Sequence, residues 1–246
     1  MVSKVISVGN KVEFTKVQAA HSNNENSHIK KKVYVSQVSE IIDDTRIKVG
    51  MPIENGHIVA VSPNTRLDAC FYTTKGLYHG RVVVVERLKE DNLYMMVVEL
   101  QYELKKFQRR QYYRLSCTMD LQYKIMDEDE IEMFVKDGEV PPSDQVMGLK
   151  DGVALDFSGG GIRFITHEKH NKNDMMYVKL KITYDDGCRE YLLVAKVIAS
   201  AEGKNGRQNF ENRVEFVELE SKIREEIIRY IFREERRQRK MDLDFR

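Results

Sequence analysis

The sequence has little that would suggest a secreted or membrane-embedded protein. Its three cysteines, Cys70, Cys117 and Cys188, are odd in number and widely spaced, so they form neither a disulfide framework nor a CxxC zinc pair. Residues 1–10 lack the charged head, apolar stretch and small-residue cleavage site of a signal peptide. The longest apolar runs, such as residues 93–98, are far too short to span a bilayer. We therefore expect a cytoplasmic protein with free thiols.

The sequence also lacks an excess of charge of either sign. Its 246 residues carry 40 Lys and Arg against 39 Asp and Glu, a formal net charge of +1. This balance excludes a histone-like or polyanionic protein, so any binding of an anion has to depend on a local cluster of cations. The length suggests one large or two modest domains.

Short segments rich in β-branched and aromatic residues make up the first part of the chain. They are separated by turn residues such as Asn-Gly and Pro-Asn. The strands expected there cover residues 33–38, 57–62, 80–86 and 93–99. The polar, Asn-rich segment from His21 to His28 is expected to be a loop. Many short strands with frequent turns favour antiparallel barrels or sandwiches over a parallel sheet with crossover helices.

A second series of expected strands begins near Tyr112. These strands cover residues 121–125, 162–165, 176–182, 190–198 and 212–217. Residues 127–150 interrupt the series as a polar, acidic insertion, expected to be a loop with at most a short helix. From Ser221 onward the spacing changes, because Ile223, Ile227, Tyr230 and Ile231 recur on one helical face. This single apolar stripe predicts a C-terminal helix that packs on its own barrel.

The segment from residue 105 to residue 114 carries the strongest local charge. It has five cations, three aromatic residues and no acid in ten positions. A charge run of this kind is usually a solvated linker. However, arginine supplies a planar donor fork suited to phosphate oxygens and to the O6/N7 edge of guanine. The segment also lies where one β domain is expected to end and another to begin, and such junctions often hold ligands.

A second notable segment contains three consecutive glycines, Gly159 to Gly161, just before an expected strand. Glycine permits positive φ angles and lets a ligand approach the backbone closely. Asp156 and Ser158, just ahead of them, offer an acceptor and a small donor or acceptor. Taken alone, this segment is an ordinary polar turn, and it does not match the Gly-x-Gly-x-x-Gly dinucleotide fingerprint.

Together the two segments resemble the PilZ family. Its signature is Arg-x-x-x-Arg, often preceded by another Arg, followed by Asp/Asn-x-Ser-x-x-Gly. Arg110 and Arg114 match the two arginine positions and Arg109 matches the preceding one. The second motif is matched by Asp156, Ser158 and Gly161. Upstream, residues 50–57 and 71–80 are similar to the N-terminal barrel of flagellar brake proteins of the YcgR type.

The resemblance implies an all-β fold of two antiparallel barrels followed by a C-terminal α-helix. The N-terminal YcgR-like barrel would cover residues 1–104. The PilZ domain would cover residues 105–246, with the arginine-rich segment at its start, a six-stranded barrel and the helix. One departure from the family pattern precedes the last strand, where many members have a small residue and this sequence has Asn212 and Arg213.

The resemblance also implies a receptor for the bacterial second messenger cyclic di-GMP, with no catalytic residue, metal or further cofactor. Arg110 and Arg114 would bond to phosphate and to the guanine O6/N7 acceptors. Arg109 would stack on or bond to a second guanine. Its partners would be flagellar motor proteins, stator or rotor, and it would act as a motility brake at the flagellar basal body, as a monomer or weak dimer.

The second motif would complete the site for cyclic di-GMP. Asp156 would accept a hydrogen bond from a guanine N–H, and Ser158 would bond to polar atoms nearby. Gly160 and Gly161 would keep the wall of the site low. The number of ligands per site, one or two, is left open by the sequence.

Two other classes of function compete with this interpretation. The first is a nucleic-acid-binding β-barrel that uses residues 105–114, although the balanced charge elsewhere and the lack of a second aromatic-basic platform count against it. The second is an enzyme, for which His167 and His170 suggest a metal site without further ligands nearby. The sequence has no nucleophile elbow, P-loop, His-Glu-x-x-His motif or paired catalytic carboxylates.

Overall fold

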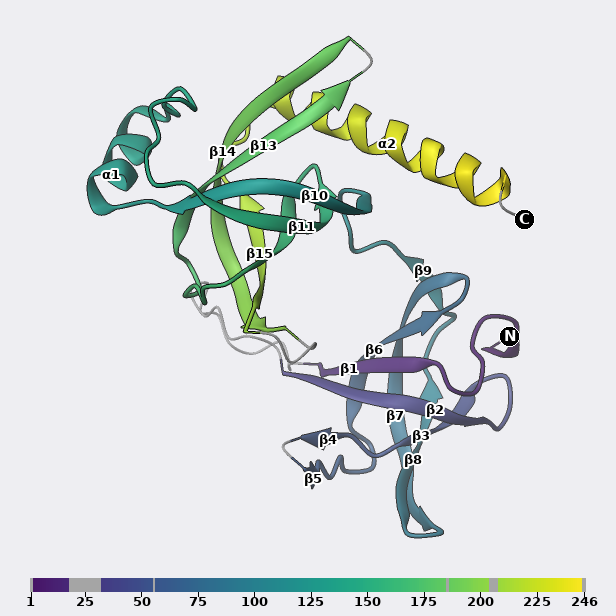
Figure 1. Cartoon of the computed structure of the whole chain (residues 1–246). Coiled ribbons are helices and arrows are strands. Elements are labelled where there is room, and N and C mark those ends of the chain that lie inside the picture. The colour runs from purple at the N-terminus through teal and green to yellow at the C-terminus, as the bar shows by residue number, and fades with distance from the viewer. Residues whose placement is uncertain (1, 18–31, 55, 185, 204–207, 245–246) are drawn as a thin grey trace. The chain divides into compact units, whose positions relative to one another are not determined.

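The computed structural model describes residues 2–17, 32–54, 56–184, 186–203 and 208–244. The segment from His21 to His28, expected to be a loop, lies outside these residues. The chain divides into two compact units, Met1–Arg109 and Arg110–Arg246 (Figure 1). Both units consist mainly of antiparallel strands, which confirms the predicted all-β class.

The N-terminal unit is built on one seven-stranded antiparallel sheet. Its strands are β1 (Lys11–Lys16), β2 (Val33–Ile41), β3 (Arg46–Gly50), β6 (Arg66–Thr73), β7 (Gly76–Glu90), β8 (Leu93–Leu100) and β9 (Lys105–Phe107). In the order β6-β1-β2-β3-β8-β7-β9, an additional pairing of β6 with β7 closes six strands into a ring. A 3₁₀ turn (Val2–Lys4) and a small hairpin of β4 (Ile53–Glu54) and β5 (His57–Ile58) complete the unit.

Strand β9 belongs to this N-terminal sheet, although the sequence analysis starts the second domain at Lys105. Phe107 and Lys105 pair with Leu77 and His79 of β7. The Phe107 ring also lies against the His79 ring, with 5.9 Å between their centroids. Because these contacts hold the first part of the basic segment on β7, the two compact units divide after Arg109.

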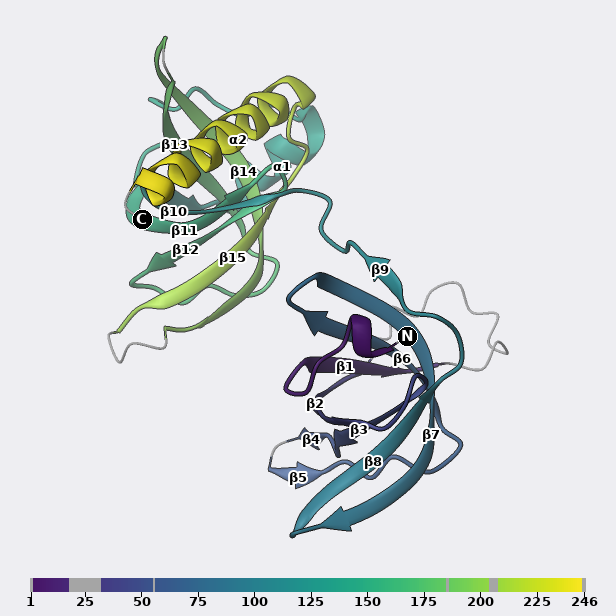
Figure 2. The ribbon, with the colours of Figure 1, turned by 90° about the vertical axis from the view of Figure 1, so that its right-hand side faces the viewer.

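The C-terminal unit contains a closed six-stranded antiparallel barrel in the order β10-β11-β12-β15-β14-β13 (Figure 2). Its strands are β10 (Arg114–Ile125), β11 (Lys150–Ser158), β12 (Gly161–Thr166), β13 (Met175–Tyr184), β14 (Gly187–Glu202) and β15 (Phe210–Phe216). Alternate side chains, among them Phe157, Phe164 and Leu180, are fully buried in the barrel. This period-two burial is the pattern that predicted the strands.

Helix α2 (Ser221–Asp244) packs on this barrel as predicted. Ile227 and Ile231 are 0% and 1% exposed and belong to the barrel's own core cluster. Ile223 and Tyr230, from the same face, are partly buried against that cluster. Neither α2 nor the other described helices are long and apolar enough to cross a membrane.

The acidic insertion contains helix α1 (Glu128–Asp137). A capping box starts it, because Asp127 Oδ1 accepts from the backbone N–H of Glu130 while Glu130 Oε2 accepts from that of Asp127. Gly138, in the left-handed conformation, ends it. Phe134 anchors the helix in a small apolar cluster beside the barrel. The insertion is thus an ordered short helix with its own packing.

Candidate ligand-binding site

The register of the barrel brings most of the predicted site residues together. Arg114 is the first residue of β10 and pairs with Ser158, the last residue of β11. Ser158 pairs in turn with Gly161, the first residue of β12. The second arginine position and the Asp-x-Ser-x-x-Gly turn therefore lie on adjacent strand ends.

The pleat of the strands decides which of these side chains face outward. Leu115 and Phe157 point into the barrel, since they are 2% and 0% exposed. Side chains alternate along a strand, so Arg114, Asp156 and Ser158 lie on the outer face. This face is the candidate ligand surface of the C-terminal unit.

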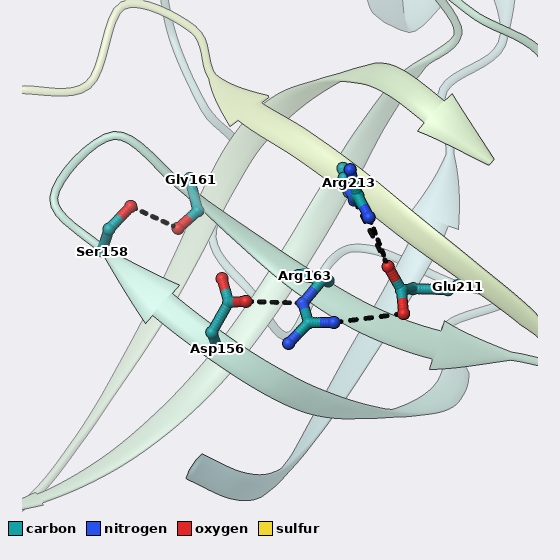
Figure 3. Close-up of polar contacts among 6 residues, drawn as sticks. All are labelled: Asp156, Ser158, Gly161, Arg163, Glu211 and Arg213. Atoms are coloured by element: carbon teal, nitrogen blue, oxygen red, sulfur yellow. Dashed lines mark hydrogen bonds and ion pairs between the residues drawn. The ribbon is translucent and has the colours of Figure 1, made fainter. Parts of the chain in front are cut away.

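The Ser158 hydroxyl is used to close the turn between β11 and β12. It donates to the carbonyl oxygen of Gly161 at 3.0 Å (Figure 3) and accepts from the backbone N–H of Gly160 at 3.4 Å. Ser158 is only 8% exposed. In this structure its first role is to fix the conformation of the turn on which Asp156 and the glycines depend.

The glycines of the motif make room for protein neighbours. A Cβ on Gly161 would lie 2.1 Å from the carbonyl oxygen of Val214, so the missing side chain lets β12 approach β15. A Cβ on Gly160 would lie 2.8 Å from a ring atom of Tyr112. The space beside Gly161 is taken by β15 and that beside Gly160 by Tyr112, and the expected role of both glycines as a low wall of the ligand site stays a prediction.

An ion-pair network lies beside the turn and was not found from the sequence (Figure 3). Arg163 stands opposite Asp156 in the β11–β12 pair, and its Nε donates to Asp156 Oδ2 at 2.5 Å. Arg163 Nη1 donates to Glu211 Oε2 at 3.1 Å, and Arg213 Nη2 donates to Glu211 Oε1 at 2.9 Å. Two arginines and two carboxylates thus alternate across three strands. Asp156 is thereby held in place by a cation.

Contacts with neighbouring residues accommodate the two residues, 212 and 213, that depart from the family pattern. Asn212 is fully buried and its Nδ2 donates to Thr166 Oγ1 at 2.8 Å, which links β15 to β12. Arg213 points outward, pairs with Glu211 and lies opposite Arg163 in the register. The Asn212 amide nitrogen and the Arg213 guanidinium thus each have a defined partner, whereas the buried Asn212 Oδ1 accepts no hydrogen bond from the described residues.

The network also shifts the ionisation of its members. Burial alone would raise the pKa of Glu211, but hydrogen bonds from Arg213 and Arg163, together with their charges, lower it below 4.5. Burial alone would lower the pKa of Arg163, but the hydrogen bonds and charges of Asp156 and Glu211 raise it. The network therefore favours the charged forms of Glu211 and Arg163.

A stability test follows from the lowered pKa of Glu211. Its stabilisation is complete well above the ordinary glutamate pKa of 4.5 and is lost as the pH falls from there through the lowered pKa of the folded state, because the unfolded state binds the proton first. Glu211→Gln is expected to lower the free energy of unfolding by about 1 kcal/mol at pH 7, because a partly exposed ion pair contributes little more than this. In urea unfolding, the difference in free energy of unfolding between the wild-type protein and Glu211→Gln should become smaller as the pH is lowered from about 7 to 3.5. Glu215→Gln, exposed on the same strand, is the control, and a cost for Glu211→Gln that does not change with pH would contradict the assignment.

Arg109 and Arg110 lie on either side of the division between the units. Arg109 Nη1 lies 3.5 Å from Glu13 Oε2, and its guanidinium carbon is 5.3 Å from the centroid of the Tyr72 ring. Both contacts are within the N-terminal unit. Arg110, the first residue of the C-terminal unit, has an exposed side chain. The structure therefore associates Arg109 with β1 and β6, separately from Arg114 and Asp156.

The two histidines singled out in the sequence do not form a site together. His170 is 6% exposed and packs edge-on against Tyr123, with 5.3 Å between the centroids, whereas His167 is exposed. Burial lowers the pKa of His170, so this side chain is a neutral part of the core at pH 7. Across the described part of the chain, no group of three or more His, Cys, Asp or Glu is placed to hold a metal ion.

The fold and the site define a class of protein. It is an all-β chain of two units in which an arginine-rich segment leads into a six-stranded barrel with an Asp-x-Ser-x-x-Gly turn on its outer face. The sequence model of the PilZ domain matches residues 108–233, and the model described as flagellar protein YcgR matches residues 7–100. The chain belongs to the PilZ-domain family, with the two-domain organisation of the YcgR type.

Solved structures share this fold. The Bacillus subtilis inhibitor of motility, MotI/DgrA, is 16% identical and aligns over 95% of this chain and 100% of its own, with a TM-score of 0.72. YcgR from Escherichia coli in complex with c-di-GMP is 13% identical and aligns over 97% of this chain and 89% of its own, with a TM-score of 0.50. Among curated proteins, no sequence matches this chain significantly.

Proposed function

We propose that this protein is a receptor for cyclic di-GMP that binds it through the arginine-rich segment and the Asp-x-Ser-x-x-Gly turn. The observation that carries the proposal is the register that sets Arg114 beside Ser158, with Asp156 on the same outer face. The similar Escherichia coli YcgR structure is a complex with this ligand, which supports the choice of ligand.

The chemistry of the ligand matches these side chains. Cyclic di-GMP carries two phosphates and two guanines, so a receptor needs cations together with donors and acceptors for the guanine edge. Arg110 and Arg114 supply planar guanidinium forks for phosphate and for guanine O6/N7. Asp156 accepts from a guanine N–H, and Arg163 fixes the orientation of that carboxylate. Ser158, Gly160 and Gly161 act by holding the turn in shape.

We further propose that the bound ligand changes the arrangement of the two units. The arginine segment is where the chain passes from one unit to the other, and Arg109 contacts Glu13 and Tyr72 of the N-terminal unit. A ligand that recruits Arg109 as well as Arg114 would favour the arrangement to which it binds best. Small-angle X-ray scattering with and without cyclic di-GMP tests this step, and identical curves at saturation would contradict it.

The effect of this rearrangement is proposed to be on motility. The protein would act in the cytoplasm, on a stator or rotor protein of the flagellar motor, as a monomer or weak dimer. Similarity to a Bacillus subtilis inhibitor of motility supports a braking rather than an activating effect. Deletion of the gene is expected to enlarge the swimming zone of cells with high cyclic di-GMP, and an unchanged zone would contradict this role.

A binding competition separates the receptor from a nucleic-acid-binding protein and from an enzyme. Fluorescently labelled cyclic di-GMP is bound to the protein and then challenged with unlabelled cyclic di-GMP or with single-stranded RNA. The receptor predicts displacement by the dinucleotide alone, with the recovered ligand chemically unchanged. Displacement by RNA at equal nucleotide concentration, or conversion of the ligand to a linear product, would favour the other classes.

A further inference from the structure

Two tyrosines stand between the two arginines of the Arg-x-x-x-Arg motif, and both contact helix α2. Tyr112 Oη lies 3.0 Å from Arg224 Nη1, with the guanidinium carbon 5.4 Å from the centroid of the tyrosine ring. Tyr113 stacks on Phe232 with 6.1 Å between centroids and 24° between planes. The motif is therefore attached to the helix at two points, Arg224 and Phe232, which lie about two turns apart.

Arg224 connects three separate segments of the C-terminal unit through one guanidinium. Its Nη1 donates to Tyr112 Oη and to the carbonyl oxygen of Gly159, both at 3.0 Å. Its Nη2 donates to the carbonyl oxygen of Leu219 at 3.4 Å. The arginine segment, the β11–β12 turn and the start of α2 are thus held by the same side chain, which is only partly exposed.

The ring of Tyr112 packs on the backbone of the glycine turn. A Cβ on Gly159 would lie 3.0 Å from Tyr112 Cδ1, and a Cβ on Gly160 would lie 2.8 Å from Tyr112 Cδ2. The distance at Gly160 is too short for a side chain and the one at Gly159 is tighter than most Cβ contacts, so the Tyr112 ring packs directly on the backbone of these two glycines. The Tyr112 ring, together with Ile228 at Gly159, accounts for glycine at the two variable positions 159 and 160 of the motif in this chain.

The position of Tyr112 limits where the neighbouring arginines can be. Arg110 and Arg114 each lie two residues from it, and two residues of chain span at most about 7 Å. Mutual repulsion among the cations opposes keeping the segment on the turn. The aromatic contact and the bonds of Arg224 hold it there.

We propose that Arg224 is a positioning residue of the cyclic di-GMP site, which docks Tyr112 on the Gly159–Gly160 turn and so presents Arg110 and Arg114 to the ligand. This inference rests on the proposed function of the site. The physical effect is preorganisation: the segment is ordered before binding, so its ordering does not weaken the affinity.

The test uses two variants of the full chain, Tyr112→Phe and Arg224→Met. Tyr112→Phe keeps the ring on the glycines and removes only the hydroxyl, whereas Arg224→Met keeps the aliphatic stem and removes the guanidinium. Each is expected to bind cyclic di-GMP about tenfold more weakly by isothermal titration, the effect of losing a hydrogen bond to a charged group. The melting temperature of the ligand-free Tyr112→Phe variant should stay within about 2 °C of wild type.

The double variant and a matched control decide between positioning and a general effect on the fold. Because both changes break the same bond, the double variant should bind about as weakly as Arg224→Met alone. Arg229→Met, on the exposed side of the same helix and paired with Glu225 at 3.2 Å, should bind as wild type does.

Four outcomes would overturn the inference. Wild-type affinity in Tyr112→Phe would do so even if Arg224→Met failed to fold, and so would additive losses in the double variant. Absence of binding by the wild-type protein would overturn the proposed function and this inference with it. If the wild-type protein and both variants, Tyr112→Phe and Arg224→Met, bind cyclic di-GMP with equal affinity, the positioning role is wrong while the proposed function stands.

Discussion

Arg114→Glu is expected to abolish binding of cyclic di-GMP, with a loss of affinity of about 100-fold or more. The substitution removes charge-assisted hydrogen bonds, each worth about 1.5–3 kcal/mol, and adds repulsion between a carboxylate and the phosphates. Isothermal titration should show no saturable heat at ligand concentrations that saturate the wild-type protein.

The fold should tolerate this change, which makes the result interpretable. Arg114 has an exposed side chain at the first position of β10, and surface substitutions of this kind usually shift stability by less than about 0.5 kcal/mol. Arg229→Glu, a charge reversal on the exposed face of α2, is the matched control and should bind normally. Wild-type affinity in Arg114→Glu would contradict the assignment of the arginine motif to the cyclic di-GMP site.

Gly161→Ala is expected to destabilise the C-terminal barrel by about 3 kcal/mol, at the upper end of the usual cost of overpacking. The added Cβ would meet backbone atoms only, with Val214 O at 2.1 Å, Val214 C at 3.1 Å and Glu215 Cα at 3.2 Å. Backbone cannot rotate away as a side chain does, so β12 and β15 have to separate where Gly161 pairs with Glu215. Urea unfolding followed by circular dichroism measures the loss.

A glycine in an open strand position provides the comparison. Gly50 in β3 would place its Cβ 3.7 Å from the Ser36 hydroxyl oxygen, an ordinary contact, and its φ is not in the left-handed region. Gly50→Ala should therefore change stability by less than about 1 kcal/mol. Equal effects of the two substitutions would show that the close approach of β12 to β15 does not explain the glycine at position 161.

Most of the fold follows from patterns that are local in the sequence. Alternation of buried and exposed residues predicted many of the strands, but β1, β3, β6 and β11 were not among those expected, and only His57–Ile58 of the expected strand 57–62 forms one. The stripe of Ile223, Ile227, Tyr230 and Ile231 predicted both helix α2 and its packing on the barrel. The three residues of β9 could not be assigned in this way, since a short basic strand shows no period. Only its pairing with β7 places it in the N-terminal unit.

The candidate site was predictable where its residues are close in the sequence or carry the family motif. Asp156, Ser158 and Gly161 lie within one turn, and the pairing of β10 with β11 adds Arg114. Arg163 was missed, although its place two residues after Gly161 puts it on the outer face by simple alternation.

Contacts between segments far apart in the chain could not be predicted. Glu211 reaches Arg163 across the β12–β15 pair, and Arg224 reaches Tyr112 from a helix more than 100 residues later. Neither pairing leaves a pattern in a single sequence, because it depends on the closure of the barrel and on the path of α2 over it. The neighbours of Gly160 and Gly161, which are Tyr112 and Val214, could not be predicted for the same reason, since they come from other segments.

The central claim is tested most directly by isothermal titration of the intact protein with cyclic di-GMP, which gives both affinity and stoichiometry. We predict saturable binding with a dissociation constant of about 10 μM or lower, about −7 kcal/mol or stronger, at one or two ligands per chain. The same titration of Arg114→Glu should give no binding. Absence of saturable heat with the wild-type protein, or equal affinity in the two proteins, would contradict the proposal.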